Sequence, residues 1–506
     1  ASGGSPGATL AGTISTATHG GEFKKQLLID KVLAVHLIGP DGKEWWIEGN
    51  NEVITIAEIE ALYTGINFIG KGWSNKGLDA EDFLRAVVTS MGTMGIIYSV
   101  VLEVVPQFSV QQATYRYQSD AFPIIPLIPM PGVNQTGWDK LLKKAGVNVS
   151  QLIDKSPIEN DKILNFLIDG TLNGTGIAKA DNEYMDLAIN PLSKTCWIVN
   201  RKYLPFIAND DKETDLISNY INSLSSELRE STEPALFSKE LTKIGQFLSI
   251  PTDIPGMIFG GGVNLNFLNG FQNNGYLFLS ALLAKIQVKA KSNVELHPEH
   301  PNLGHEFLGD ILDGVLNALQ GTIEEPKSIT SGLATRVGAI GWPNTGMPGR
   351  GFEVSMNPKI AFSFVNDLLK RIDEFRLKNK VFLGYISIRL CPQTNTLMGM
   401  QQFSPFSVMI EVVAHRTLES NEVFDDLIKF TKGYMSFSSS NIGTYPCFHW
   451  GLETEEIDKV YLAKTPLNLP YKDSTRINKF KGVKHYICGS NKNFDNYFVE
   501  RMGLGV

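Results

Sequence analysis

The first hundred residues show a hydrophobic pattern that changes from apolar runs to helical spacing and back. Two apolar runs flank residues 39–42 (GPDG), a turn sequence that predicts a β-hairpin. Residues 55–69 and 79–88 instead carry apolar side chains at the spacing of a helix, as in AEDFLRAVV. The segment 90–106 begins with two glycines and continues as a β-branched apolar run, which predicts a tight turn leading into a strand. We therefore expect a hairpin, helical segments and a further strand.

The middle of the chain, residues 107–435, holds most of the predicted helices and several strands. Residues 122–133 contain four prolines and predict a loop or extended edge, either a buried crossing, which we favour, or a lipid or partner contact. Residues 275–291 are apolar and then basic, which favours a buried helix with a solvated end over a membrane-surface helix. The alternation in 406–416 predicts a core strand in which His415 is structural.

Composition restricts the class of protein. The 506 residues are 43% hydrophobic and 20% charged, which is typical of a folded chain of two or three domains. A net charge of −7 argues against a general binder of nucleic acid or anionic membranes. No apolar run reaches about 18 residues, so we expect a soluble protein without a transmembrane helix, and secretion or a periplasmic location stays open. Four cysteines without a CxxC pair argue against a disulfide scaffold and a structural zinc site, and we expect no metal.

The segment 9–20 (TLAGTISTATHG) is the first candidate for chemistry. Small residues and hydroxyl side chains dominate it. Small side chains let a backbone approach a ligand closely, and N–H and hydroxyl groups suit phosphate oxygens. A surface loop before a strand is the alternative. The segment matches neither the GxGxxG nor the GxxxxGK[ST] pattern, and residues 1–22 lack the basic and apolar regions of a signal peptide.

Together with the hairpin and the turn at 90–96, this segment resembles part of a known flavoprotein domain. The likeness is to the second half of the FAD-binding domain of vanillyl-alcohol-oxidase-type (PCMH-type) FAD-linked oxidases, closest to the sugar-1,4-lactone and alditol oxidases. In that family a TxGGxIxTGTHG loop wraps the FAD pyrophosphate, and a SLGxLGVI turn meets the adenosine part. The resemblance implies FAD as cofactor, bound by the matching residues Thr9, Gly12, Thr13, Thr16, Thr18, His19, Gly20, Ser90, Gly92, Gly95 and Ile96.

The C-terminal end carries a second match to the same family. Residues 448–453 (FHWGLE) resemble a PHWGK segment, with Leu452 in place of the lysine. Residues 493–506 (NFDNYFVERMGLGV) resemble a GxFxNxYxxRxLGL tail that folds back beside the flavin. The resemblance implies that Asn496 lies near the flavin ring, with a part in cofactor binding and catalysis. The alternative for His449 is a core histidine beside a packed tryptophan.

Two further segments resemble the catalytic strands of the family. GFEVSMNP places Glu353 in an E[FY]xxP strand, and KVFLGYISIRLCP places Arg389 at the arginine of an SEIR or VEVR strand. A guanidinium there can hold the alcohol oxygen and stabilise negative charge on the reduced flavin; an internal salt bridge is the alternative for Arg389. Ser387 stands where the family has glutamate. Because serine is no base near neutral pH, the resemblance leaves His449 as the candidate base, with Arg389, Glu353 and Asn496 as the other catalytic candidates.

The resemblance also sets expectations for the front of the FAD domain. Family members carry a first FAD-binding subdomain before the THG loop, and here the loop comes almost at once. We expect an omitted front, or a cleaved N-terminal fragment retained as a second chain, to complete the domain, because an isolated half would expose an unpaired sheet. Loss of FAD binding is the third alternative. No cysteine occupies residues 5–9, so bicovalent flavin attachment is not expected, and a single histidyl link stays open.

The sequence thus predicts an α+β protein with an FAD-binding second subdomain at 1–106. A substrate-binding domain at 107–435, built on an antiparallel sheet flanked by helices, and a C-terminal segment at 436–506 that returns to the FAD-binding domain would complete it. The implied activity is FAD-dependent oxidation of the CH–OH group of a small-molecule alcohol by hydride transfer to flavin N5, with O2 or another acceptor. Alternatives are an oxidase of a bulky lipophilic alcohol such as a sterol, since type II cholesterol oxidases share this architecture, and a non-catalytic binding subunit. The chain lacks a GxSxG motif, which disfavours a hydrolase.

Overall fold

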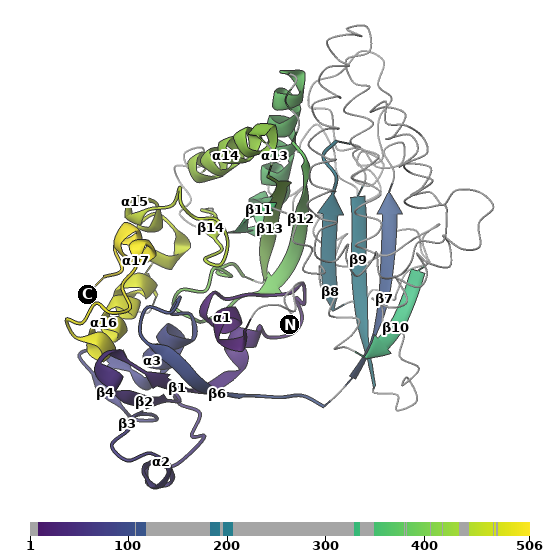
Figure 1. The fold of residues 1–506 in the computed structure, drawn as a ribbon. Coiled ribbons are helices and arrows are strands. Elements are labelled where there is room, and N and C mark those ends of the chain that lie inside the picture. Colours follow the sequence, from purple (N-terminus) through teal and green to yellow (C-terminus); the bar gives the residue numbers. More distant parts are fainter. Residues whose placement is uncertain are drawn as a thin grey trace, which may run out of the picture.

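Two sheets with helices packed on them organise the chain in the computed structural model (Figure 1). This combination confirms the α+β class. The predictions for 122–133 and 275–291 lie outside the residues that the structure describes. The structure describes residues 9–106, 108–117, 183–192, 196–205, 328–333, 349–378, 380, 382–404, 406–416, 418–434, 445–468, 470–471 and 474–505.

The smaller sheet has four strands in the order β3-β2-β1-β6, and the predicted hairpin forms its centre. β1 and β2 pair antiparallel around residues 39–42, with Ile38 opposite Glu44. Asp41 adopts φ 66° in the turn, a left-handed conformation that Asp tolerates better than most residues. The predicted strand after the two glycines pairs with the other side of β1. The strands are β1 (Val32–Ile38), β2 (Glu44–Ile47), β3 (Asn67–Ile69) and β6 (Ile96–Leu102).

The helix expected over 55–69 is only partly formed. α2 (Ile56–Leu62) starts at a capping box between Thr55 and Glu58. It ends before Gly65, whose φ of 80° is a conformation that a helix cannot continue through. Asn67–Ile69 then joins β2 as the parallel strand β3, so the apolar residues of the second half serve a sheet instead. The helix expected over 79–88 is confirmed as α3 (Ala80–Val88), capped by Asp79.

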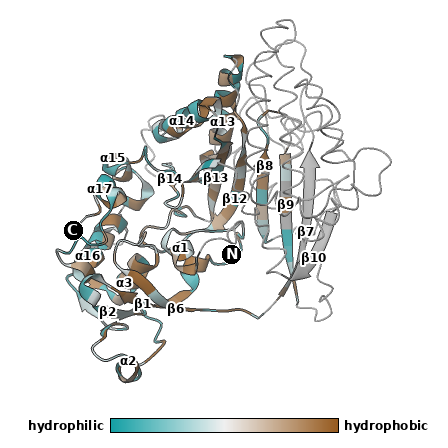
Figure 2. Ribbon diagram, viewed as in Figure 1, coloured by the Kyte–Doolittle hydropathy of each residue, from teal (hydrophilic) through white to brown (hydrophobic). Residues whose placement is uncertain are grey.

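The C-terminal helix α16 (Arg476–Cys488) packs against α3, so the two ends of the described chain share one core (Figure 1). α3 is mainly hydrophobic (Figure 2), and its Phe83 belongs to the same buried cluster as Phe480 of α16. Lys484 of α16 is completely buried and pairs with Asp495, which ties the last residues to this unit. The domain boundaries near residues 106 and 435 stay predictions.

The larger sheet is antiparallel throughout and has the order β10-β7-β9-β8-β12-β13-β11-β14. Two helices, α13 (Pro358–Leu377) and α14 (Leu418–Gly433), pack on β13. The strand expected over 406–416 is confirmed as β13. The strands are β7 (Phe108–Tyr117), β8 (Tyr184–Ile189), β9 (Cys196–Pro205), β10 (Ser328–Leu333), β11 (Gly349–Met356), β12 (Gly384–Pro392), β13 (Phe406–His415) and β14 (Cys447–Phe448).

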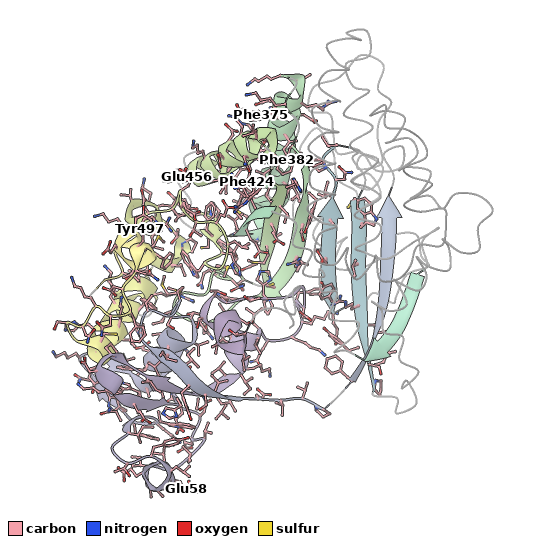
Figure 3. The ribbon with its side chains drawn as sticks, viewed as in Figure 1. Glu58, Phe375, Phe382, Phe424, Glu456 and Tyr497 are labelled. Atoms are coloured by element: carbon pink, nitrogen blue, oxygen red, sulfur yellow. The ribbon has the colours of Figure 1, made fainter. Side chains whose placement is uncertain are left out.

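Alternate residues of β11, β12 and β13 face opposite sides of this sheet, and the two sides differ in character. One side is apolar and packs against the helices: the ring centroids of Phe352 and Phe424 are 5.3 Å apart. Figure 3 labels Phe424 on α14. The other side carries Glu353, Arg389 and Glu411. We call this second side the charged face.

The remaining elements are short. No helix within the described residues is both long and apolar enough to cross a membrane. The other elements are α1 (Leu10–Ser15), β4 (Ser74–Asn75), β5 (Leu78–Asp79), α15 (Lys459–Leu462), β15 (Pro470–Tyr471), β16 (Ser474–Thr475), α17 (Tyr497–Met502) and the 3-10 turns η1 (Leu28–Lys31), η2 (Pro40–Gly42) and η6 (Pro466–Asn468).

Candidate active site

Strand register brings the polar residues of the charged face into one row. Glu411 of β13 lies opposite Glu353 of β11 on one side and opposite Ser387 of β12 on the other. Arg389 follows Ser387 by two residues and therefore faces the same way, with Asp186 of β8 opposite it. Four neighbouring strands thus place a cation, a hydroxyl and three carboxylates on one patch of sheet.

Arg389 lies between two of these carboxylates. Its Nε is 3.5 Å from Asp186 Oδ2 and its Nη2 is 3.5 Å from Glu411 Oε2. Burial alone would lower the pKa of Arg389, but the surrounding carboxylates raise it well above its usual value. Ser387 donates its hydroxyl to Asp186 Oδ1 at 3.0 Å. Arg389 therefore forms the internal ion pairs that were the alternative to a catalytic role. It also lies on the charged face, where the catalytic role would place it.

The two glutamates of the row differ in protonation. Burial raises the pKa of Glu411 to about 7, and the charge of Arg389 offsets this only in part. Burial acts in the same direction on Glu353, but the charge and hydrogen bond of His19 outweigh it and lower the pKa of Glu353 to about 2. Glu353 is therefore a fixed anion at neutral pH, whereas Glu411 can gain or lose a proton there.

The N-terminal segment reaches the charged face through a short sheet contact. Glu22 forms an isolated bridge with Tyr184, and Met185 N donates to Gly21 O at 3.0 Å. A Cβ at Gly21 would clash with the carbonyl oxygen of Met185, so only glycine permits this approach. The loop after α1 is thereby fixed across the start of β8, and His19 is directed at Glu353.

His19 is held from both sides of its ring. Its Nδ1 donates to the Gly20 carbonyl oxygen at 2.8 Å, and its Nε2 lies 3.0 Å from Glu353 Oε2. The Cys391 thiol is also 3.1 Å from Nδ1. Because a carbonyl and a carboxylate both accept, both nitrogens must carry hydrogen. The negative neighbours outweigh burial and raise the pKa of His19 well above its usual value, so the ring is an imidazolium.

His449 lies beside the same glutamate in a different state. Its backbone N–H donates to Glu353 O at 2.8 Å, and its Nδ1 accepts from Gly451 N at 3.0 Å. The hydrogen of the neutral ring is therefore on Nε2, 4.0 Å from Glu353 Oε2. Burial lowers the pKa of His449 to about 4. In this geometry neither ring nitrogen offers a lone pair to an alcohol proton, so the structure gives no support to His449 as the base.

The same hydrogen bonds argue against a metal ion at this place. His19, Glu353 and His449 each offer a ligand atom, and these atoms lie within 4.8 Å of one another. A cation would need a ring lone pair from each histidine. His19 carries hydrogen on both nitrogens, and His449 uses its lone pair for Gly451. The donor set suits a charged hydrogen-bond network better than a metal ion.

The two segments matched to FAD-binding motifs lie against each other. Met91 N donates to Ser15 O at 3.1 Å, which joins the turn at 90–96 to the end of α1. The prediction of a loop over 9–20 is wrong for residues 10–15, which form α1. Thr9 is the N-cap of this helix, and its hydroxyl accepts from Gly12 N. The hydroxyls of Thr13 and Thr16 bond to helix carbonyls at 2.9 and 3.0 Å.

The glycines of the second motif have separate roles. Gly92 (φ 71°) is exposed, and a Cβ there would meet open space. Gly95 (φ 149°) packs so closely on Ile38 that a Cβ would clash with its carbonyl oxygen. Ile96 is 59% exposed, whereas Ser90 is buried and its hydroxyl has no hydrogen-bond partner among the described residues.

Among the described residues, no contact brings Asn496 to the charged face. It is the exposed N-cap of α17, and its side-chain oxygen accepts from Val499 N at 3.1 Å. The next residue, Tyr497, is 73% exposed (Figure 3). The tail does pack on the segment around His449, because the rings of Trp450 and Phe498 are 5.8 Å apart. A role for Asn496 near a flavin ring stays a prediction.

Three residues of this candidate site were not predicted from the sequence: Glu411, Asp186 and Cys391. Cys391 follows Arg389 by two residues on β12, Asp186 lies opposite Arg389 on β8, and Glu411 lies opposite Ser387 on β13. A lone acid inside a buried strand is an unusual choice, since burying an unpaired charge is costly. The single acidic residue within an apolar stretch is present in MIEVV for Glu411 and in YMDLAI for Asp186.

Comparison with known proteins gives a fold. No protein-family model and no curated relative matches the chain. Among solved structures, a variant of cholesterol oxidase from Brevibacterium sterolicum is 11% identical, with 99% of this chain and 76% of that chain covered at a TM-score of 0.53.

Two further structures have lower TM-scores. FgChi7B is 10% identical over 99% of this chain and 72% of that one, and Phl p 4, a grass pollen allergen with glucose dehydrogenase activity, is 9% identical over 98% and 70%; both have a TM-score of 0.44. These scores add nothing to the first comparison. The chain shares the fold of the cholesterol oxidase.

Proposed function

We propose that this chain is an FAD-dependent oxidoreductase that oxidises the CH–OH group of an alcohol. The observation that carries the proposal is the charged face, where Arg389 lies among carboxylates next to the segment that the family resemblance assigns to FAD. The fold shared with a cholesterol oxidase is consistent with this chemistry.

The residues present fit a large polar cofactor. The Ser90 hydroxyl and Glu353 Oε1 are buried and lack hydrogen-bond partners among the described residues, which is costly unless a ligand or solvent supplies them. The open space at Gly92 and the half-buried hydroxyls of Thr16 and Thr18 border the same segments. A flavin bound there would accept the hydride of the alcohol carbon at its N5.

The side chains of the charged face divide the remaining work. The Arg389 guanidinium can hold the alcohol oxygen by charge-assisted hydrogen bonds and stabilise negative charge that develops on it. The His19 imidazolium and Glu353 fix the N-terminal loop against the sheet and keep a positive charge beside it. The substrate, the electron acceptor, and an N-terminal fragment or second chain that completes the site all stay predictions.

Absorption spectroscopy of the purified protein tests the proposal. A band near about 450 nm, present on isolation or after incubation with FAD, supports it. A protein that stays colourless after reconstitution would overturn it. A yellow protein whose flavin no alcohol reduces, across cholesterol and a set of sugar alcohols, would favour the non-catalytic binding subunit. Denaturing mass spectrometry in the same experiment reports a covalent flavin adduct or a second chain.

The Arg389→Ala variant locates the reaction. We expect flavin to remain bound while its reduction by an alcohol slows by roughly 100-fold or more, because the group that holds the alcohol oxygen is lost. Anaerobic stopped-flow mixing measures the rate. Arg376→Ala, on the helix-covered side of the sheet at the end of α13, serves as the matched arginine control. Unaltered reduction in Arg389→Ala would remove Arg389 from the site.

A further inference from the structure

We propose that Glu411 is the catalytic base that removes the hydroxyl proton of the alcohol. The inference deepens the proposed function and rests on it. Ser387 and Glu411 are Cα partners on adjacent antiparallel strands, so their side chains leave the same face of the sheet side by side. A carboxylate that β12 lacks at position 387 is therefore present one strand away, on β13.

The other two carboxylates of the charged face each have one hydrogen-bonded oxygen, and the second oxygen of Glu353, Oε1, is buried. Glu353 Oε2 is bound by the His19 ring at 3.0 Å, and its side chain is only 5% exposed. Asp186 accepts from Ser387 at 3.0 Å and pairs with Arg389. The contact shown for Glu411 is the ion pair with Arg389 at 3.5 Å, and its side chain is 19% exposed. Glu411 is thus the most exposed carboxylate of this row, next to the guanidinium that would hold the alcohol oxygen.

The surroundings of Glu411 suit a base that works near neutral pH. Burial raises its pKa to about 7, where a carboxylate is basic enough to take a proton and is still half ionised. Below pH 7 Glu411 keeps its proton, and above pH 7 it is an anion. The titratable and charged groups that surround it come from four elements: Arg389 and Tyr385 on β12, Glu353 on β11, Asp186 on β8 and His19 on the N-terminal loop.

The proposed step is balanced. The alcohol O–H bond breaks and its proton goes to a Glu411 carboxylate oxygen. The C–H bond breaks, and a bound FAD, the oxidant of the proposed function, would take its hydrogen with two electrons. The alcohol carbon and oxygen become a carbonyl. Arg389 holds the oxygen throughout, so the proton and the hydride leave a fixed substrate.

A carboxylate exchange across the strand pair tests this assignment. In Glu411→Gln we expect flavin reduction by an alcohol to slow roughly 100- to 10,000-fold, with FAD still bound. The double variant Ser387→Glu with Glu411→Ser places the carboxylate back on β12 and should recover at least about tenfold of that rate. Glu103→Gln, a surface carboxylate paired with Lys31, is the control and should behave as the wild type. A wild-type rate in Glu411→Gln would overturn the proposal.

Sulfite supplies a readout that needs no substrate. This anion adds reversibly to protein-bound flavins and bleaches the band near about 450 nm, so its Kd reports the charge beside the ring. We expect Glu411→Gln to bind sulfite roughly tenfold more tightly than the wild type at pH 8.5, because a negative charge is removed. The two Kd values should converge at pH 5.5, where Glu411 is protonated, and their ratio cancels the titration of sulfite itself.

The sulfite outcomes separate the two proposals. A ratio near one at every pH, in a yellow protein, overturns the role of Glu411 and leaves the flavoprotein assignment intact. A protein that binds no FAD overturns both. The sulfite ratio decides the matter where no alcohol of the set reduces the wild-type flavin.

Discussion

Alternate residues of β11, β12 and β13 form the two sides of this part of the sheet, and the two sides differ in chemical character. On one side Ile386, Ile388 and Leu390 are completely buried in the core shared with α13 and α14. On the other, Ser387 lies opposite Glu411 of β13 and Arg389 lies opposite Asp186 of β8. Burial of apolar surface stabilises the fold, whereas burial of charge costs free energy unless every group is paired. The apolar side therefore stabilises the sheet, and the charged face is the side on which we propose the chemistry.

The largest effect on stability is expected on the apolar side, in Phe352→Ala. The Phe352 ring is fully buried and packs on Phe424 of α14 and on Phe448. Removing it leaves a cavity and should lower the free energy of unfolding by about 3–5 kcal/mol. Urea denaturation measures the change, and Leu377→Ala, at a 63% exposed position on α13, should cost less than about 0.5 kcal/mol. Equal losses in the two variants would contradict the assignment of the apolar side to stability.

A smaller, pH-dependent effect is expected on the charged face, in Glu353→Gln. The folded-state pKa of Glu353 is about 2, below its ordinary 4.5, so ionised Glu353 stabilises the fold above pH 4.5. This stabilisation, on the order of a few kcal/mol, should be lost as the pH falls from about 4.5 to about 2. Denaturation at a series of pH values measures it, and the variant should lack this acid dependence.

His19, the partner of Glu353, sets the upper limit of the pH range in which this ion pair stabilises the fold. The folded-state pKa of His19 is raised, so its contribution is fully present below its ordinary 6.5 and is lost as the pH rises through the folded value. The difference in stability between wild type and Glu353→Gln should therefore be greatest between about pH 4.5 and 6.5. A difference that grows toward pH 2 would show that the ion pair does not stabilise the fold.

The smallest effect is expected at the end of the charged face, in Cys391→Ala. The buried thiol donates to Gly20 O at 3.0 Å and lies 3.1 Å from His19 Nδ1. Its loss should cost about 1 kcal/mol, since His19 keeps its bonds to Gly20 and Glu353. Thermal denaturation measures the loss, and Cys391→Ser, which retains a donor, should recover part of it. A loss as large as that of Phe352→Ala would mean that the thiol fixes the loop by itself.

Local patterns predicted the local elements well where one interaction decides the conformation. The GPDG hairpin and α3 with its Asp79 cap formed as expected, because turn and capping preferences act within a few residues. The prediction failed at residues 67–69, where pairing with β2 outweighed helical spacing. It failed again at α1, where Thr9 caps a helix and the sequence was read as a ligand loop.

The site was predicted in part. Glu353, Arg389, His19 and His449 were named from motifs, and the fold brings these four to one place. Glu411 and Asp186 were not named, because a single acid in a strand carries no motif. Only the register of four strands makes them neighbours of Arg389.

The α+β class, the alternation in 406–416, and the candidate residues on Thr9–Gly20 and the HWG segment were predicted from the sequence alone. These depend on residue type and on periods of 2 and 3.6, which are properties of a local stretch. Only the fold establishes where His19, Glu353 and Glu411 lie and the direction in which the pKa of each shifts. Those follow from burial and from charges that are close in space but as many as 334 residues apart along the chain.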